Sequence, residues 1–222
     1  MSLDVCYAQK RFHVQIQLLG KHWAYAVLAA ISTGIAAGIS LERDVQAVKT
    51  FAPVLNRMSP YETTDGITFI CDDCKAPLWT ISASLDFMRT AKAERKVAVI
   101  GSISDTPKNF HDRYRTVIRQ ALDAVDKIVF VGDHAHIALK ARPHPEDDRV
   151  MAFDTLYQLN SFLSNYLKAG DLVLLKGSMN ADHLQRIVLS RTNDIACWQE
   201  KCGKLRFCSG CRYQHSPSVP HP

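Results

Sequence analysis

Short apolar runs alternate with longer amphipathic segments between about residues 55 and 190, and this alternation limits the possible folds more than any other feature of the chain. The apolar runs have the length of strands, whereas the segments between them carry apolar residues at helical spacing. The pattern predicts strands over 67–71, 97–101, 127–131 and 171–175, with a weaker one over 149–152. It predicts helices over 80–93, 109–125, 134–140, 154–168 and 181–190.

These strand–helix repeats predict an α/β fold with a parallel sheet. The run 97–101 is apolar throughout, as expected for a strand that helices cover on both faces. Connections between parallel strands are right-handed, so each crossover returns over a face of the sheet. We therefore expect a Rossmann-like, mostly parallel sheet with helices on both faces, in a domain over residues 55–195.

Charged residues follow the first strand of this domain. The run 67–71 alternates in the manner of a strand and stops at Asp72 and Asp73, which Lys75 follows. Open α/β sheets bind their ligands at the carboxyl ends of the strands, so this pattern favours a ligand site. The alternative is a solvated turn whose carboxylates cap the next helix.

The first 54 residues have a different character. Residues 11–20 alternate apolar and polar positions, which predicts a half-buried strand. A single strand cannot bury its own apolar face, and the residues before it are too few to supply partners, which suggests a sheet upstream or on a partner chain. Two helices are expected over 24–38 and 40–51, the second of them capped by Ser40. This pair is too small to form a domain alone.

The tail, residues 196–222, holds four of the seven cysteines. Cys208 and Cys211 form a Cys-x-x-Cys knuckle, in which two thiolates can share one tetrahedral ion. Cys197 and Cys202 lie close enough in sequence to complete four ligands, with His215 as a substitute for either. We expect these four cysteines to bind zinc. An iron–sulfur cluster uses the same residue type, and a reduced tail with incidental cysteines is the third alternative.

Composition narrows the class of protein. Of the 222 residues, 47% are apolar and 22% are charged, as in a globular protein with a core. The formal charge is +5 and the basic residues are scattered, which favours small anionic ligands and argues against nucleic acid as a partner. No apolar run reaches the ~18–20 residues of a membrane span, and no secretion signal is recognisable, so a cytoplasmic location is expected.

Several stretches, in this order, resemble the C-terminal portion of the Mur ligases, ATP-dependent enzymes that add amino acids or D-Ala-D-Ala to the peptidoglycan precursor. The matching stretches are Gly20-Lys-His22-Trp23 before an alanine-rich helix, Ser40-Leu-Glu42, and Asp72-Asp73-Cys74-Lys75-Ala76. Residues 170–178, Gly-Asp-Leu-Val-Leu-Leu-Lys-Gly-Ser, are similar to the Gly-Asp-x-Val-Leu-Val-Lys-Gly-Ser of the branch that adds D-Ala-D-Ala. The resemblance covers about residues 10–190.

The resemblance implies a ligase for peptidoglycan synthesis. With ATP and Mg²⁺, such an enzyme joins the carboxylate of a UDP-MurNAc-peptide to D-Ala-D-Ala or another amine through an acyl-phosphate. Residues 1–54 would be the end of the ATP-binding central domain, and the domain after it would present the amine by positioning it. Arg57 would contact the nucleotide from the linker, Asp73 would bind the ribose hydroxyls, and His22 would lie near the adenine. Lys75 would face the phosphates or the incoming substrate, as the candidate catalytic residue.

The chain departs from the family pattern at several positions. Trp23 stands where the family has the asparagine that meets adenine, and Met179 where it has an arginine. The sequence contains no Gly-x-x-x-x-Gly-Lys-Ser/Thr loop, so we predict that the chain alone is inactive and that a missing N-terminal half or a partner chain carries this P-loop. The alternative is a non-catalytic, Mur-ligase-like binding module with a metal-binding tail. A P-loop-encoding segment directly upstream would favour the ligase.

Overall fold

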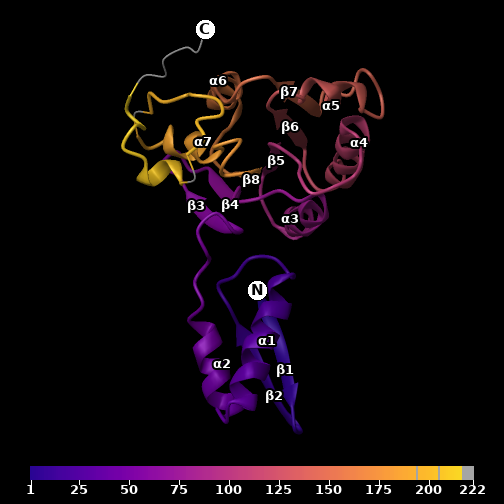
Figure 1. The fold of residues 1–222 in the computed structure, drawn as a ribbon. Helices are drawn as coiled ribbons and strands as arrows, with labels where there is room; N and C mark the ends of the chain where they lie inside the picture. The colour runs from indigo at the N-terminus through magenta and orange to yellow at the C-terminus, as the bar shows by residue number, and fades with distance from the viewer. Residues whose placement is uncertain (194, 205, 217–222) are drawn as a thin grey trace. The chain divides into compact units, whose positions relative to one another are not determined.

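The computed structural model describes residues 1–193, 195–204 and 206–216, and the chain divides into two units, Met1–Ser59 and Pro60–Pro222 (Figure 1). The first unit begins with a β-hairpin, in which β1 (Ser2–Tyr7) pairs antiparallel with β2 (Lys10–Gln15). Ala8 and Gln9 connect the strands with φ angles of 46° and 64°, as two-residue hairpin turns require. The expectation that the residues before 11–20 could not supply a partner strand was wrong. Neither turn residue is the glycine, asparagine or aspartate that marks such a hairpin in a sequence.

Two helices complete the hydrophobic core of the first unit. Buried residues of α1 (Trp23–Ala36) and α2 (Leu41–Lys49) pack in one cluster with hairpin residues such as Val5 and Val14. The Asp44 carboxylate occupies the space that a Cβ on Gly34 would fill, so the glycine permits the close approach of the two helices. The predicted cap of the second helix is confirmed, because the Ser40 hydroxyl accepts a hydrogen bond from the Arg43 amide at 3.5 Å.

The second unit is built on a six-stranded sheet in the order β3-β4-β8-β5-β6-β7. Its strands are β3 (Ser59–Glu62), β4 (Thr68–Asp72), β5 (Arg95–Ile100), β6 (Lys127–Val131), β7 (Val150–Phe153) and β8 (Asp171–Lys176). The five strands β4, β8, β5, β6 and β7 pair in parallel with one another, which confirms the predicted mostly parallel, Rossmann-like sheet. The edge strand β3 was not predicted, because its four residues include a proline and show no apolar pattern.

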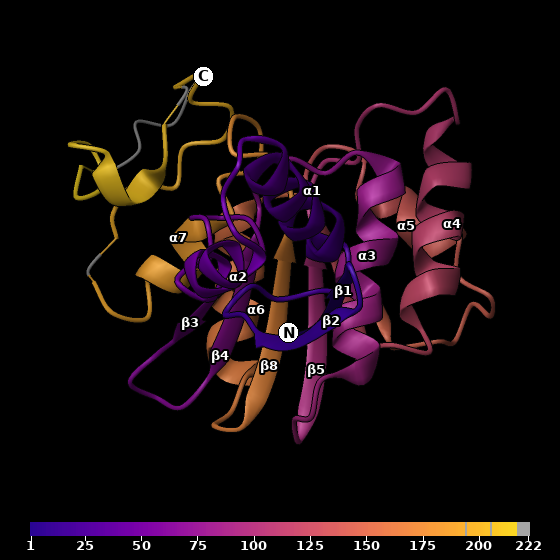
Figure 2. The same cartoon turned by 90° about the horizontal axis from the view of Figure 1, so that it is seen from below.

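Helices cover both faces of this sheet (Figures 1 and 2). They are α3 (Leu78–Thr90), α4 (Phe110–Ala121) and α5 (His136–Lys140) on one face, and α6 (Leu156–Tyr166) and α7 (Gln185–Leu189) on the other. Buried residues of α6 and α7 form one cluster with alternate strand residues such as Phe69, Val99 and Val173. On the opposite face Tyr114 of α4 meets Phe130 of β6, with ring centroids 5.0 Å apart. In the part of the chain that the structure describes, no helix has the length and apolar character needed to cross a membrane.

Candidate functional site

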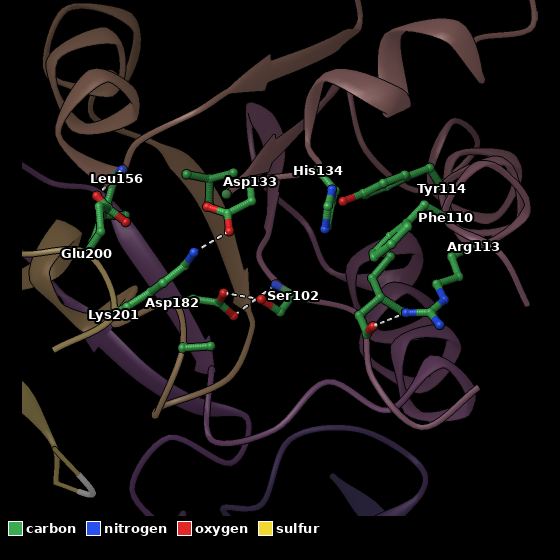
Figure 3. Close-up of a pocket in the computed structure, with 14 residues that line it drawn as sticks. Ser102, Phe110, Arg113, Tyr114, Asp133, His134, Leu156, Asp182, Glu200 and Lys201 are labelled. Atoms are coloured by element: carbon green, nitrogen blue, oxygen red, sulfur yellow. Dashed lines mark hydrogen bonds and ion pairs between the residues drawn. The ribbon is translucent and has the colours of Figure 1, made fainter. Parts of the chain in front are cut away.

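A cavity of about 150 Å³ lies at the carboxyl edge of the sheet in the second unit (Figure 3). Ser102 follows β5, Asp133 and His134 follow β6, and Asp182 follows β8, so residues far apart in the sequence meet here. The chain passes from β5 to α4 on one face of the sheet and from β8 to α7 on the other. Such a switch in direction between neighbouring strands leaves the crevice in which open α/β sheets bind ligands.

Asp182 forms the floor of the cavity and joins two loops. Its carboxylate accepts hydrogen bonds from the Ser102 amide at 2.9 Å, the Ser102 hydroxyl at 2.6 Å and the Ser178 amide at 2.6 Å. Burial raises the pKa of Asp182, while these hydrogen bonds oppose the rise. The carboxylate also lies against Gly101 and Gly177, where any side chain would meet it. The two glycines thus leave room for a buried carboxylate at the ends of β5 and β8.

Gly101→Ala is expected to lower the free energy of unfolding of the second unit by about 1–3 kcal/mol, the usual cost of overpacking. The added Cβ would overlap the Asp182 carboxylate. Urea unfolding of the variant tests this, with Gly210→Ala as the control, because a Cβ on Gly210 meets nothing within 4 Å. Equal stability of the two variants would contradict the close packing described for Asp182.

Charged side chains of both signs line the mouth of the cavity. Lys201 of the tail pairs with Asp133, and this contact lowers the pKa of Asp133 (Figure 3). Glu200 accepts a hydrogen bond from the Leu156 amide at the start of α6, at 3.1 Å. Burial raises the pKa of Glu200. The tail therefore forms part of the wall of this cavity, where Lys201 meets Asp133 from 68 residues earlier in the sequence.

Aromatic and basic groups form the opposite wall. The rings of Phe110 and His134 lie 3.9 Å apart, and the Arg113 guanidinium lies 4.9 Å from the centre of the Phe110 ring. Arg113 also donates hydrogen bonds to the carbonyls of Ile103, Thr106 and Lys108, which fixes the loop after β5. Burial raises the pKa of Tyr114 to about 12, so its hydroxyl stays protonated at neutral pH.

The size and charges of the cavity suit a small zwitterion. A volume of about 150 Å³ is below the range of ~300–1,000 Å³ that is common for drug-sized ligands, so a nucleotide does not fit inside it. Asp133 offers a carboxylate to an ammonium group, and His134 and Lys201 offer donors to a carboxylate. An amino acid or short peptide carries both groups.

The two carboxylates at the end of β4, those of Asp72 and Asp73, are buried in the structure. Lys176 donates to Asp72 at 2.7 Å, and the Ser84 hydroxyl donates to the same oxygen at 2.6 Å. Asp72 and Asp73 are 7% and 1% exposed, so the alternative of a solvated turn was wrong. Lys75, two residues further on, is exposed.

Asp73 is the more unusual of the pair. Its Oδ1 atom is buried and has no hydrogen-bond partner among the described residues. Burial raises the pKa of Asp73 to about 7, with smaller contributions from the negative charges of Asp72 and Asp182. Backbone amides of Asp73 itself and of Gln185 oppose the rise. A carboxyl group in such a place is protonated for part of the time at neutral pH.

The other two residues assigned to the nucleotide belong to the first unit. His22 precedes α1 and is exposed, with its ring centroid 5.6 Å from that of Trp23. Arg57 is exposed, between two buried residues that both have positive φ, Asn56 and Met58. The predicted set of His22, Arg57, Asp73 and Lys75 is thus shared between the two units.

The four cysteines of the tail line a second cavity, of about 460 Å³. The histidine that lines it is His183, from the loop after β8, rather than the His215 suggested from the sequence. Within residues 1–193, 195–204 and 206–216, no three histidine, cysteine, aspartate or glutamate side chains are placed so that they could hold a metal ion as they stand.

Sequence reasoning missed most residues of the first cavity. Asp182, Ser102 and Asp133 each follow an apolar strand within a few residues, the same signal that drew attention to Asp72 and Asp73. Applied to every strand instead of the first, this signal would have found them. Nothing in the local sequence of Glu200 and Lys201 indicates that they reach the cavity.

Comparison with known proteins places this fold in a family. The family model described as "Mur ligase, glutamate ligase domain" matches residues 56–179, more than half of the chain. The UDP-N-acetylmuramoyl-tripeptide–D-alanyl-D-alanine ligase of Bacillus subtilis is 27% identical over 168 residues, which are 73% of this chain and 36% of that protein. The UDP-N-acetylmuramate–L-alanine ligase of Desulforamulus reducens is 23% identical over 200 residues, which are 86% of this chain and 43% of that protein.

Solved structures agree in fold. The UDP-N-acetylmuramoylalanyl-D-glutamyl-2,6-diaminopimelate–D-alanyl-D-alanyl ligase of Acinetobacter baumannii has a TM-score of 0.73 at 23% identity, over 85% of this chain and 40% of that one. A Thermotoga maritima MurF ligase, solved in complex with ADP, has a TM-score of 0.62 at 16% identity, over 82% and 40%. The chain spans less than half of the length of these relatives. It belongs to the Mur ligase family, and what it contains of that family is the C-terminal portion.

Proposed function

We propose that the chain is the C-terminal part of an ATP-dependent Mur-type ligase. The reaction would join the carboxylate of a UDP-MurNAc-peptide to the amine of D-Ala-D-Ala or of another amino acid, for peptidoglycan synthesis. The observation that carries this proposal is the small cavity at the carboxyl edge of the sheet, with charged groups of both signs at its mouth. The names of the relatives support the same reaction class.

In this scheme the cavity holds the amine substrate. The Asp133 carboxylate attracts its ammonium group, and His134 and Lys201 attract its carboxylate. The nitrogen, once it has lost a proton, attacks the acyl carbon of the activated substrate, and phosphate leaves. The contribution of this chain is orientation of the nucleophile, which can lower a barrier by several kcal/mol when the reacting atoms are held close together.

ATP, when bound, would supply the phosphoryl group that activates the carboxylate. Each of the four residues that the family resemblance assigns to the nucleotide carries a group suited to part of it. Asp73 has an acceptor without a hydrogen-bond partner among the described residues, to which a ribose hydroxyl would donate. Asp73 is 1% exposed, so its carboxylate would have to become accessible for this contact to form. Arg57 and Lys75 are exposed cations suited to phosphates, and His22 is an exposed ring suited to the adenine side. The phosphate-binding loop would come from another segment or a partner chain.

The second candidate is a non-catalytic binding module. The observation that favours it is the absence of a Gly-x-x-x-x-Gly-Lys-Ser/Thr loop from the printed sequence. A module of this kind would bind its small ligand in the same cavity. It would form no amide, even when combined with a region that carries a P-loop.

Asp133→Asn is expected to raise the KM for the amine about tenfold and to leave kcat nearly unchanged, when the chain acts together with a P-loop-bearing region. The variant removes a charge that would bind the amine equally well in the ground state and in the transition state. Loss of one charge-assisted hydrogen bond costs about 1.5 kcal/mol or more. Steady-state rates of amide formation at varied amine concentration give both constants.

Lys140→Ala is the control for this measurement, because Lys140 is exposed and lies outside the cavity. If Asp133→Asn and Lys140→Ala both keep the parental KM, the amine binds elsewhere. A fall in kcat with unchanged KM would instead give Asp133 a role in the chemical step.

A further inference from the structure

The cavity of about 460 Å³ that residues of the tail line, called the tail cavity below, differs in charge from the one at the carboxyl edge of the sheet. Its volume falls in the range of ~300–1,000 Å³ that is common for small-molecule sites. Three basic side chains line it, those of Arg186, Lys204 and Arg206, and none of the described aspartates or glutamates does. Its charged side chains are therefore all of one sign.

Arg186 is the most unusual of the three, because it is 3% exposed. Its Nη1 atom donates to the Gln199 carbonyl at 2.9 Å, and its guanidinium also contacts the Cys208 thiol. Neither partner is a carboxylate, and none of the ion pairs formed by the described residues includes Arg186. Buried arginines are almost always paired, since it is costly to remove an unpaired charge from water. The tail cavity thus contains a buried positive charge with no opposite charge against it.

Glu200 is near enough for its pKa to respond to this charge, but it does not pair with it. Its carboxylate accepts a hydrogen bond from the Leu156 amide at 3.1 Å and lines the other cavity. Burial raises the pKa of Glu200, and the charge of Arg186 opposes this rise without cancelling it. Glu200 therefore does not take the place of an anion in the tail cavity.

The other two cations extend the positive charge toward the surface. Arg206 is exposed and Lys204 is half-buried. The Lys204 Nζ atom lies 4.6 Å from the centre of the ring of Tyr213, which lines the same cavity. Arg212 donates to the Tyr213 hydroxyl at 2.6 Å, so that hydroxyl still has its own hydrogen to donate. An anion in the cavity would meet a buried guanidinium, two further cations and a hydroxyl donor.

These groups suit phosphate better than a carboxylate. A guanidinium presents a planar set of N–H donors that matches two phosphate oxygens, and a lysine adds a compact positive charge. A phosphate monoester carries about 1.5–2 negative charges at pH 7, so one or two such groups balance three cations. A single carboxylate would leave two of the three without an opposite charge.

We propose that the tail cavity binds a small molecule that carries one or two phosphate groups, with a phosphate against Arg186 and with Lys204 and Arg206 beside it. None of the four residues assigned above to the nucleotide of the ligase reaction lines this cavity. The site is therefore distinct from the ATP site of the proposed reaction. The inference goes beyond the ligase proposal, and its tests need no ligase activity.

Calorimetric titration of the full chain with inorganic pyrophosphate, which has two linked phosphates, gives the dissociation constant. Arg206→Gln and Lys204→Gln should each raise this constant about tenfold, because each removes a charge-assisted contact with phosphate. These two variants carry the test, since Arg186 is buried and its replacement can prevent folding. Arg119→Gln is the matched control. It removes an exposed arginine of α4, outside the tail cavity, and should leave the constant unchanged.

Thiol modification shows where in the chain the ligand binds. Cys202 and Cys211 line the tail cavity, whereas Cys6 is an exposed thiol of the first unit. Bound pyrophosphate should slow the reaction of Cys202 and Cys211 with iodoacetamide, because it shields them and weakens the positive field that favours thiolates. Mass spectrometry of the digested protein gives the rate at each cysteine, and the rate at Cys6 should not change.

Four results would overturn the proposal. The first is no measurable binding of pyrophosphate to the parent chain at millimolar concentration. The second is an equal loss of affinity in Arg206→Gln and Arg119→Gln, which would mean diffuse attraction to the net charge of the chain. The third is a loss in Arg57→Gln with none in Arg206→Gln or Lys204→Gln, which would place pyrophosphate at the proposed ATP site. The fourth is tighter binding of succinate than of pyrophosphate, which would make the ligand a dicarboxylate.

Discussion

Replacing Lys176 with methionine is expected to lower the free energy of unfolding of the second unit by about 3–5 kcal/mol, because it leaves a buried carboxylate without its partner. Lys176 is 3% exposed and donates to Asp72 at 2.7 Å, across neighbouring positions of β8 and β4. After the substitution the Ser84 hydroxyl still donates a hydrogen bond to Asp72. A neutral donor does not compensate for a buried charge, however.

Hydrogen exchange of the central β5 and β8 amides measures this loss, since such amides exchange through unfolding of the whole unit. Lys140→Met is the control, because Lys140 is exposed and its replacement should change stability by no more than about 0.5 kcal/mol. The double variant Asp72→Asn/Lys176→Met removes both charges and should recover most of the loss. If the single and double variants lose equal stability, the ion pair is not the cause.

The second large effect is expected at Asp73, where Asp73→Asn should stabilise the second unit at alkaline pH. Burial raises the pKa of Asp73 to about 7, whereas an aspartate in the unfolded chain has a pKa near 4. Between these values the folded state binds the proton more tightly than the unfolded state does. Stability of the parent protein therefore falls as the pH rises from about 4 to about 7.

The size of this effect follows from the shift. About three pKa units at 1.36 kcal/mol each give a loss on the order of 4 kcal/mol, complete above about pH 8. Asparagine does not ionise, so the variant lacks this part of the pH dependence. The difference in unfolding free energy between Asp73→Asn and the parent should grow from pH 4 to pH 8 and then level off.

Urea unfolding at a series of pH values measures this difference. Asp154→Asn controls for the loss of a carboxylate at the surface, because Asp154 is exposed. A difference between Asp73→Asn and the parent that stays constant from pH 4 to pH 8 would contradict the raised pKa. A difference that shrinks with rising pH would mean that the folded state stabilises the ionised carboxylate.

The fold could be predicted because apolar periodicity is a local property. The runs 97–101 and 171–175 correspond to β5 and β8, and the capping serine of α2 was visible in the sequence. The two missed strands, β1 and β3, lack such signals. The hairpin turn of β1 uses Ala8 and Gln9, and the four residues of β3 have no apolar pattern.

The site was predictable only in part, because its contacts are long-range. The strand end at Asp72 and Asp73 was recognised, but their burial depends on partners such as Lys176, 104 residues away. Ser102 and Asp182 are 80 residues apart, and Lys201 and Asp133 are 68 apart. No local pattern in the sequence specifies which loops come into contact. The cavity at the carboxyl edge of the sheet could therefore be found only from the folded arrangement of β5, β6 and β8.

The proposed ligase function can be tested directly by transplanting this domain. In the UDP-N-acetylmuramoyl-tripeptide–D-alanyl-D-alanine ligase of Bacillus subtilis, the C-terminal region that aligns with this chain would be replaced by the corresponding residues of this chain. The chimaera should form the amide product from UDP-MurNAc-peptide, ATP and an amine, and Asp133→Asn within it should raise the KM for the amine. A folded chimaera that forms the acyl-phosphate but transfers it to no amine would contradict the account.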